Sequence, residues 1–320
     1  MQVKDYAQGR NWIAYNADCV EVARELETDS IGFIVYSPPF SSLYTYSNDE
    51  RDMGNCKDDA EFFMHFGFLI TEMYRILQPG RLMAVHCMNL PTSKANDGYI
   101  GIKDFRGDLI RAFQDAGFIY HSEVCIWKDP VVAMQRTKAL GLLHKQLKKD
   151  SSLSRQGIAD YLVVMRKPGD NERPIEGELE YYVGDEPPPG FRPIQRADGV
   201  TLWVVGSDES TNIDTWQRYA SPVWMDINQT RTLQYQNARA TDDERHIAPL
   251  QLDVIERAMQ LWSREGDVVF SPFMGIGSEG YVALQMDRKF IGAELKESYF
   301  ALARRNLDEA ENVKQLDMLA

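Results

Sequence analysis

Apolar runs and helical repeats alternate along the first 167 residues of the chain. The predicted strands are rich in β-branched and aromatic residues, as in strands covered on both faces, and lie at 31–36 (IGFIVY), 81–88 (RLMAVHCM), 118–127 and 160–167. The predicted helices have apolar residues at helical spacing and lie at 20–27, 58–77 and 104–116. This alternation predicts a parallel α/β layer fold for the first half of the chain.

The pattern changes after Pro168. Residues 170–200 are rich in acidic residues, proline and glycine, which predicts an inserted module with loops. Regular elements then return as a helix at 249–263, a strand at 267–273, a glycine turn, a helix at 281–287, a strand at 289–295 and a last helix from about Ser298. We therefore expect an α/β region up to residue 167, an inserted module after it and a second α/β region at the end of the chain.

Composition narrows the class of protein. The 320 residues are 44% hydrophobic and carry 48 Asp and Glu against 35 Lys and Arg, a globular composition that excludes a disordered or fibrous chain. No apolar run approaches the roughly 18 residues of a membrane span, and the start of the chain is polar, so we expect a cytoplasmic protein. The four cysteines are widely spaced without a CxxC pair, which indicates reduced thiols and no metal site.

A glycine turn follows the predicted strand at 267–273. Gly275 and Gly277 leave bare backbone against which a ligand can lie, and Glu294 closes the next strand. An acid there can accept hydrogen bonds from ribose hydroxyls, and its separation of 19 residues from Gly275 fits the about 20 of nucleoside-binding α/β units. The pattern indicates a nucleoside site, with a purely structural tight turn as the alternative.

A second motif, Ser37-Pro38-Pro39-Phe40, follows the buried run at 31–36. The prolines fix the backbone and donate no hydrogen bond, so the Ser37 hydroxyl and the Pro38 carbonyl can both act as acceptors. An exocyclic amino group offers two N–H donors to such a pair, and a base can stack on Phe40. The alternative is a stiff turn with a core phenylalanine.

Together, this SPPF segment and PFMGIGS at 272–278 resemble the amino-group DNA methyltransferases, which use S-adenosylmethionine to methylate cytosine N4 or adenine N6. The resemblance covers about residues 10–167 and 222–308, and the order of the motifs is that of the beta class. It implies an α/β fold, the circularly permuted, Rossmann-like, seven-stranded methyltransferase sheet. It also implies a catalytic half at 1–167, an inserted target-recognition region at 168–221 and a cofactor half at 222–320.

The resemblance implies a role for each matching residue. The catalytic residues are Ser37, Pro38, Pro39 and Phe40. S-adenosylmethionine is the cofactor, and its methionine portion is surrounded by Pro272, Phe273, Gly275, Gly277 and Ser278, with Pro249 and Leu250 behind it. Glu294 holds the ribose hydroxyls, and Asp18 and Cys19 hold the adenine edge. The family usually has Asp where this chain has Ser271, so we expect weaker cofactor affinity or a substitute acid.

The expected reaction is direct, in-line methyl transfer to a base flipped out of the duplex. The two acceptors at the motif stabilise the positive charge that develops on the attacking nitrogen. Family members with Ser at the first position mostly modify cytosine N4, which we favour, whereas those with Asp or Asn mostly modify adenine N6. The chemistry of the motif alone leaves both bases open.

Positive charge gathers at 128–167, where nine Lys and Arg stand against three Asp. This stretch is the expected phosphate-facing surface, with a solvated loop as the alternative. The DNA-binding candidates are Arg136, Lys138, Lys145, Lys148, Lys149 and Arg155. The aromatic and basic residues of 203–235 are candidates for base reading, although most, Trp224 included, are expected to pack in the core. Structural roles are expected for Asp226, His246 and His86.

Double-stranded DNA is the expected partner, without a membrane. A cognate restriction endonuclease and the choice between monomer and homodimer stay open. An alternative of another class is a catalytically weak module that binds the cofactor and DNA, against which the intact SPPF, GIGS and Glu294 speak.

Overall fold

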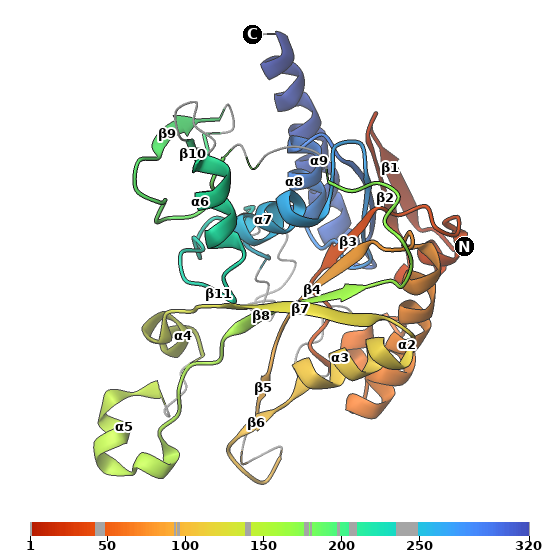
Figure 1. The fold of residues 1–320 in the computed structure, drawn as a ribbon. Helices are drawn as coiled ribbons and strands as arrows, with labels where there is room; N and C mark the ends of the chain where they lie inside the picture. The colour runs from red at the N-terminus through yellow and green to blue at the C-terminus, as the bar shows by residue number, and fades with distance from the viewer. Residues whose placement is uncertain are drawn as a thin grey trace.

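A nine-stranded mixed sheet forms the centre of the molecule (Figure 1). This computed structural model describes residues 2–41, 49–92, 94, 97–137, 142–175, 179, 181–196, 199–204, 210–234 and 249–319. From edge to edge the strands are β1 (Asp5–Gln8), β2 (Trp12–Asn16), β13 (Lys289–Ala293), β12 (Val268–Ser271), β3 (Phe33–Tyr36), β4 (Leu82–Met88), β8 (Asp160–Arg166), β7 (Ile119–Ile126) and β11 (Val223–Trp224).

The seven strands from β2 to β7 form the expected methyltransferase sheet. Strands β2, β13, β12, β3 and β4 are parallel neighbours, whereas β8 runs antiparallel to both β4 and β7. The expectation of a parallel layer is therefore wrong for β8, because an apolar run indicates burial and not strand direction. Strands β1 and β11 extend the sheet at its two edges.

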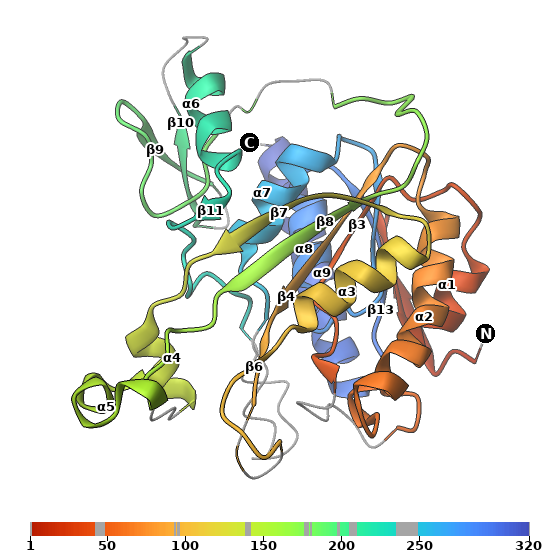
Figure 2. The same ribbon diagram turned by 60° about the horizontal axis from the view of Figure 1, so that its bottom comes forward.

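Helices cover both faces of the sheet (Figure 2). One face carries α1 (Cys19–Glu25), α2 (Asp59–Ile76) and α3 (Phe105–Asp115), and the other carries α7 (Leu252–Trp262), α8 (Ser278–Gln285) and α9 (Glu297–Leu319). Their apolar sides pack against strands such as β3, whose four residues are all buried. No helix in the described ranges has the length and apolar character needed to cross a bilayer.

Local signals in the sequence set the helix boundaries. The Asp58 carboxylate accepts a hydrogen bond from the Glu61 N–H at the start of α2, and the helix ends at Ile76, shortly before Pro79. Helix α8 begins at Ser278 and not at the expected residue 281, because Gly277 adopts a left-handed conformation (φ 87°) that ends the turn there.

Smaller elements project from the sheet. They are β5 (Leu90–Pro91), β6 (Ile102–Lys103), α4 (Pro130–Thr137), α5 (His144–Lys149), β9 (Arg192–Gln195), β10 (Thr201–Val204), α6 (Ser210–Tyr219) and the 3-10 turns Met53–Asn55 and Ser151–Leu153. Helices α4 and α5 lie in the basic stretch 128–167, for which the sequence analysis predicted no helix. Strands β9 and β10 and helix α6 lie in the inserted region 168–221.

Arg257 of α7 attaches this inserted region to the sheet. Its fully buried guanidinium donates to the Val183 carbonyl and the Asp226 carboxylate at 2.8 and 2.7 Å. The same group lies 4.9 Å from the ring centre of Tyr219 and 5.2 Å from that of Trp224. The structural roles expected for Trp224 and Asp226 are thereby confirmed.

Candidate active site

Three of the predicted site residues lie at one edge of the sheet, the edge formed by the carboxyl ends of its parallel strands. Ser37 follows β3, Pro272 follows β12 and Glu294 follows β13. These three strands are parallel neighbours, so their carboxyl ends lie side by side. Because β8 is antiparallel to β4, its first residue, Asp160, reaches the same edge. The edge therefore combines the two motifs that the sequence singled out.

The SPPF loop presents its polar atoms beside half-buried apolar groups. Pro38 is buried, and no hydrogen bond to its carbonyl is found among the described residues. Phe40 is half-buried, and its ring meets Phe105 edge-on at 6.3 Å. The hydroxyl of Ser41, which has a left-handed backbone (φ 52°), donates to Asp59 at the start of α2 and fixes the end of the loop. With respect to the described part of the chain, the Pro38 oxygen can thus accept a further hydrogen bond.

Ser37 has a polar neighbour that sequence reasoning missed. Its hydroxyl lies 3.1 Å from Nδ1 of His86, whose Nε2 lies 3.1 Å from Asp160 Oδ2. The second contact is too bent for a regular hydrogen bond. Lys128 Nζ lies 2.5 Å from the same carboxylate. His86 is buried, as expected, but it is not an apolar core residue, and only the pairing of β4 with β8 brings these groups together.

The charges around Asp160 favour its ionised form. Burial alone would raise the pKa of this carboxyl, but His86 and Lys128 hold the pKa below its usual range. Asp160 is 3% exposed and Lys128 is 30% exposed, so solvent reaches this set of charges only at its lysine end.

The glycine turn is bound to Glu294. One carboxylate oxygen accepts the Gly275 N–H at 3.0 Å and the other accepts the Lys296 N–H at 2.8 Å. Each oxygen keeps a lone pair for a further donor. A Cβ on Gly275 would meet nothing within 4 Å, whereas a Cβ on Gly277 would meet Ala303 of α9 at 3.3 Å. Gly275 therefore faces open space, and Gly277 allows close helix packing.

Buried polar groups at this turn fit a polar, cationic ligand. Ser271 is fully buried, and its hydroxyl has no hydrogen-bond partner among the described residues. Burial raises the pKa of Glu294 to about 7 and that of Glu279 to about 8, and repulsion from Glu294 adds to the rise at Glu279. A ligand with hydroxyl donors and positive charge would satisfy these groups, and the cofactor expected from the sequence, S-adenosylmethionine, carries both. Sequence reasoning did not single out Glu279.

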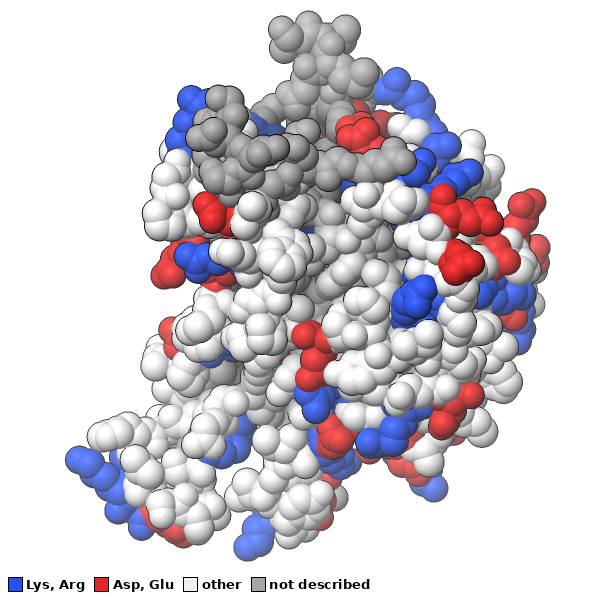
Figure 3. Space-filling model, in the orientation of Figure 1, with Lys and Arg blue, Asp and Glu red and all other residues white. Residues whose placement is uncertain are grey.

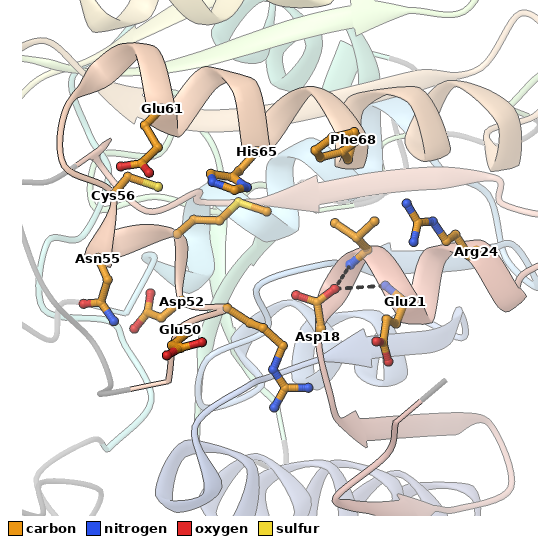
Figure 4. Close-up of a pocket in the computed structure, with 13 residues that line it drawn as sticks. Asp18, Glu21, Arg24, Glu50, Asp52, Asn55, Cys56, Glu61, His65 and Phe68 are labelled. Atoms are coloured by element: carbon orange, nitrogen blue, oxygen red, sulfur yellow. Dashed lines mark hydrogen bonds between the residues drawn. The ribbon is translucent and has the colours of Figure 1, made fainter.

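A cavity of about 360 Å³ opens beside the start of α1 (Figure 4). Asp18 lines it while its carboxylate accepts the Val20 and Glu21 N–H groups at 3.0 Å. The opposite walls come from Glu50–Cys56 and from Glu61, His65 and Phe68 of α2. Asp18 is the one predicted cofactor residue that lines this cavity, and no pattern in the sequence pointed to its other walls.

The remaining predicted cofactor residues lie in or against the core. Cys19, Leu250, Pro272 and Ser278 are buried, while Pro249 and Phe273 are half-buried. Leu250 packs with the α7, α8 and α9 side of the core. Phe273 lies against Tyr36, with ring centres 5.8 Å apart. His246 and Tyr235 fall outside the described residues.

The predicted phosphate-facing surface divides into two groups. Lys145, Lys148 and Lys149 are exposed on α5, at the end of the projection at the lower left of Figure 3, and Arg155 follows it half-buried. Lys138 and the side chain of Arg136 lie outside the described residues. Lys128 pairs with Asp160, and the buried Lys167 contacts Asp29 and the Leu77 carbonyl. Within the predicted basic stretch, Lys128 and Lys167 thus already have acidic partners.

Known DNA methylases are similar to this chain over most of its length. The model of the N6_N4_Mtase family, described as DNA methylase, matches residues 31–305. The type II methyltransferase M.BglII of Bacillus subtilis is 34% identical over 311 residues, which span 95% of this chain and 72% of that protein. The type II methyltransferase M2.DpnII of Streptococcus pneumoniae is 41% identical over 59 residues, which span 18% of this chain and only 22% of that protein.

Two solved structures share the fold. TTHA0409 of Thermus thermophilus, solved in complex with S-adenosyl-L-methionine, has a TM-score of 0.62 at 19% identity, with 92% of each chain covered. The PvuII DNA methyltransferase, described as cytosine-N4-specific, has a TM-score of 0.60 at 16% identity, with 97% of this chain and 95% of that chain covered. These neighbours confirm the fold class expected from the sequence.

Proposed function

This chain belongs to the N6/N4 DNA methylase family, and from that premise we propose that it methylates the N4 amino group of cytosine in double-stranded DNA. The cofactor of the family is S-adenosylmethionine, as the sequence predicted. The observation that carries the proposal is the position of the Ser37 hydroxyl and the Pro38 carbonyl at the carboxyl end of β3, beside the glycine turn after β12 and near Glu294 after β13. A nucleophile and a methyl donor bound at these two places would lie side by side.

The two acceptors activate the target amine. Its nitrogen is a poor nucleophile because the lone pair is delocalised into the ring. Hydrogen bonds from its two N–H groups to Ser37 Oγ and the Pro38 carbonyl stabilise the positive charge that develops as the nitrogen attacks. Bound S-adenosylmethionine supplies the methyl group, activated by attachment to a sulfonium. The base leaves the duplex stack to reach this loop, and Phe40 provides a face beside which it lies.

Different residues contact the ribose, the adenine and the methionine portion of the cofactor. Glu294 has lone pairs free for the ribose hydroxyls, and Gly275 leaves the space above the turn open. Asp18 and the cavity beside it take the adenine end. The unpartnered Ser271 hydroxyl and the Glu279 carboxyl take the methionine end. The family usually has an Asp at the position of Ser271, and in this chain Glu279 supplies the negative charge instead.

Affinity for S-adenosylmethionine should rise between about pH 6 and about pH 7.5, by about an order of magnitude for each of the two carboxyls that binding ionises. Burial raises the pKa of Glu294 to about 7 and of Glu279 to about 8, so both carboxyls are partly protonated in the free protein. Ribose donors and ligand cations favour the ionised forms, so binding lowers these pKa values and releases protons. Calorimetry in two buffers of different ionisation heat measures the protons released. Glu279→Gln should reduce the dependence of affinity on pH. An affinity that stays constant with pH, without proton release, would contradict the roles given to Glu294 and Glu279.

Base choice rests on Ser37 and has a direct test. The purified protein is incubated with duplex DNA of mixed sequence and S-adenosylmethionine that carries a deuterated methyl group, and the nucleosides are analysed by mass spectrometry. We expect label in N4-methylcytosine. Label in N6-methyladenine would keep the reaction and overturn the base, and cofactor binding without label in either would favour a catalytically weak binding module.

The lysines of α5 should contact DNA phosphates. Lys148 and Lys149 are exposed there and have no acidic partner among the described residues. Replacing both by Ala is expected to weaken binding of all duplex sequences alike and to reduce the slope of log affinity against log salt by about two. Lys289, exposed at the amino end of β13, is the matched control. Titrations at several salt concentrations decide this, and an unchanged slope would remove α5 from the interface.

A further inference from the structure

The Ser37 hydroxyl can face the target amine in two ways. If the hydroxyl proton points toward the amine or the base, Ser37 acts there as a hydrogen-bond donor. Its oxygen is then a weaker acceptor for the N–H groups of the amine. If its proton points elsewhere, both lone pairs are free to accept. Which arrangement holds depends on the group beside Ser37, which is His86 Nδ1 at 3.1 Å.

Asp160 determines which ring nitrogen of His86 carries the proton. The carboxylate lies 3.1 Å from Nε2 and is 3% exposed, so an N–H at Nε2 is attracted to it and a bare nitrogen there would be repelled. When Nε2 carries the proton, Nδ1 carries none and can only accept a hydrogen bond. The Ser37 hydroxyl must then be the donor in its contact with Nδ1. Lys128, 2.5 Å from the same oxygen, keeps Asp160 ionised.

We propose that His86 is a positioning residue for methyl transfer, held in one tautomer by Asp160 and Lys128 so that Ser37 offers only lone pairs to the target amine. The inference rests on the proposed function, in which Ser37 accepts from that amine. It extends the site from the SPPF loop to His86 of β4, Asp160 of β8 and Lys128, which follows β7.

The balance of the reaction is consistent with this arrangement. The amine lone pair forms the N–C bond, the C–S bond breaks and its electron pair remains on sulfur. The nitrogen is then cationic and must lose one of its two protons. The Ser37 oxygen can take that proton while its own proton passes to Nδ1, which yields an imidazolium beside the Asp160 carboxylate. The imidazolium then loses its proton to solvent after the product leaves.

A double-mutant cycle tests the inference. His86→Leu removes the acceptor, and His86→Asn keeps one because its amide oxygen comes close to the position of Nδ1. Each is made in the wild-type and in the Ser37→Ala background, and single-turnover methyl transfer is measured with saturating cofactor and DNA. We expect His86→Leu to slow the wild type about 10–100-fold and His86→Asn to restore most of that rate. In the Ser37→Ala background His86→Leu should have little further effect.

The outcomes separate the inference from the function. A full effect of His86→Leu in the Ser37→Ala background, or no effect in the wild type, would overturn the positioning role while the function stands. If Ser37→Ala itself leaves the rate unchanged, the proposed function fails as well. Nitrogen-15 spectra of the free protein give a readout that needs no turnover. We expect the Nε2-protonated tautomer of His86, and an Nδ1-protonated ring would contradict the proposal.

Discussion

Replacing Ser37 by Ala is expected to lower the rate of methyl transfer by about 10²–10³-fold, the usual loss when one electrostatic partner of a transition state is removed. The hydroxyl belongs to the SPPF loop and makes its one described contact with His86. Among the described residues it has no hydrogen bond to the glycine turn or to Glu294, so S-adenosylmethionine affinity should stay within about twofold of wild type. Single-turnover kinetics and calorimetry on the same preparation measure the two effects.

Ser30→Ala is the matched control for this substitution. Ser30 precedes the amino end of the same strand, β3, and its hydroxyl donates to the Glu27 carbonyl at 2.7 Å. It should change neither rate nor affinity. A Ser37→Ala protein with wild-type turnover would remove the SPPF loop from the chemistry, and equal losses in both variants would indicate general damage to the sheet.

Gly275→Val should lower affinity for S-adenosylmethionine by at least about 100-fold. Gly275 has φ 53°, which a β-branched residue adopts only with strain. A side chain there would project into the open space above the turn, where we place the cofactor. Its N–H also holds the Glu294 carboxylate, so a shift of the backbone would move that acid as well. Calorimetric titration measures the loss.

Backbone strain alone must be separated from occlusion. The control position is Gly266, which precedes β12, whereas Gly275 follows β12. Gly266 also has a left-handed backbone (φ 78°) and open space around its Cβ position. Gly266→Val should cost a similar free energy of unfolding, about 1–3 kcal/mol, and leave cofactor affinity unchanged. Similar affinities for the two variants would contradict the placement of the cofactor at the turn.

The fold could be predicted where hydrophobic pattern and turn chemistry agree. The continuous apolar runs at β3, β4 and β12, and the glycine turn before α8, are confirmed within a few residues. The direction of β8 could not be predicted, because a run such as DYLVVMRK shows that both faces are buried but not which way the strand runs. Helices α4 and α5 were missed because, at eight and six residues, they are too short for a helical repeat to stand out in the sequence.

The site could be predicted in part for a similar reason. Ser37 and Glu294 stand in contiguous motifs, so sequence alone indicated them. His86 and Asp160 are separated by 74 residues and meet only through the antiparallel register of β4 and β8. Lys128 and Lys167 counted as surface charges in the sequence, but Asp160 and Asp29 pair with them. Charge counts along a chain do not reveal which charges have partners.

Whether the chain methylates DNA, and on which base, is decided by nucleoside mass spectrometry on DNA from cells that express the wild-type protein or its Ser37→Ala variant. We predict N4-methylcytosine above the empty-vector level with the wild type and much less of it with the variant. N6-methyladenine in its place would retain an amino-methyltransferase and overturn the choice of base. DNA without either methylated base, from cells that contain folded, cofactor-binding protein, would contradict the claim that this chain methylates DNA.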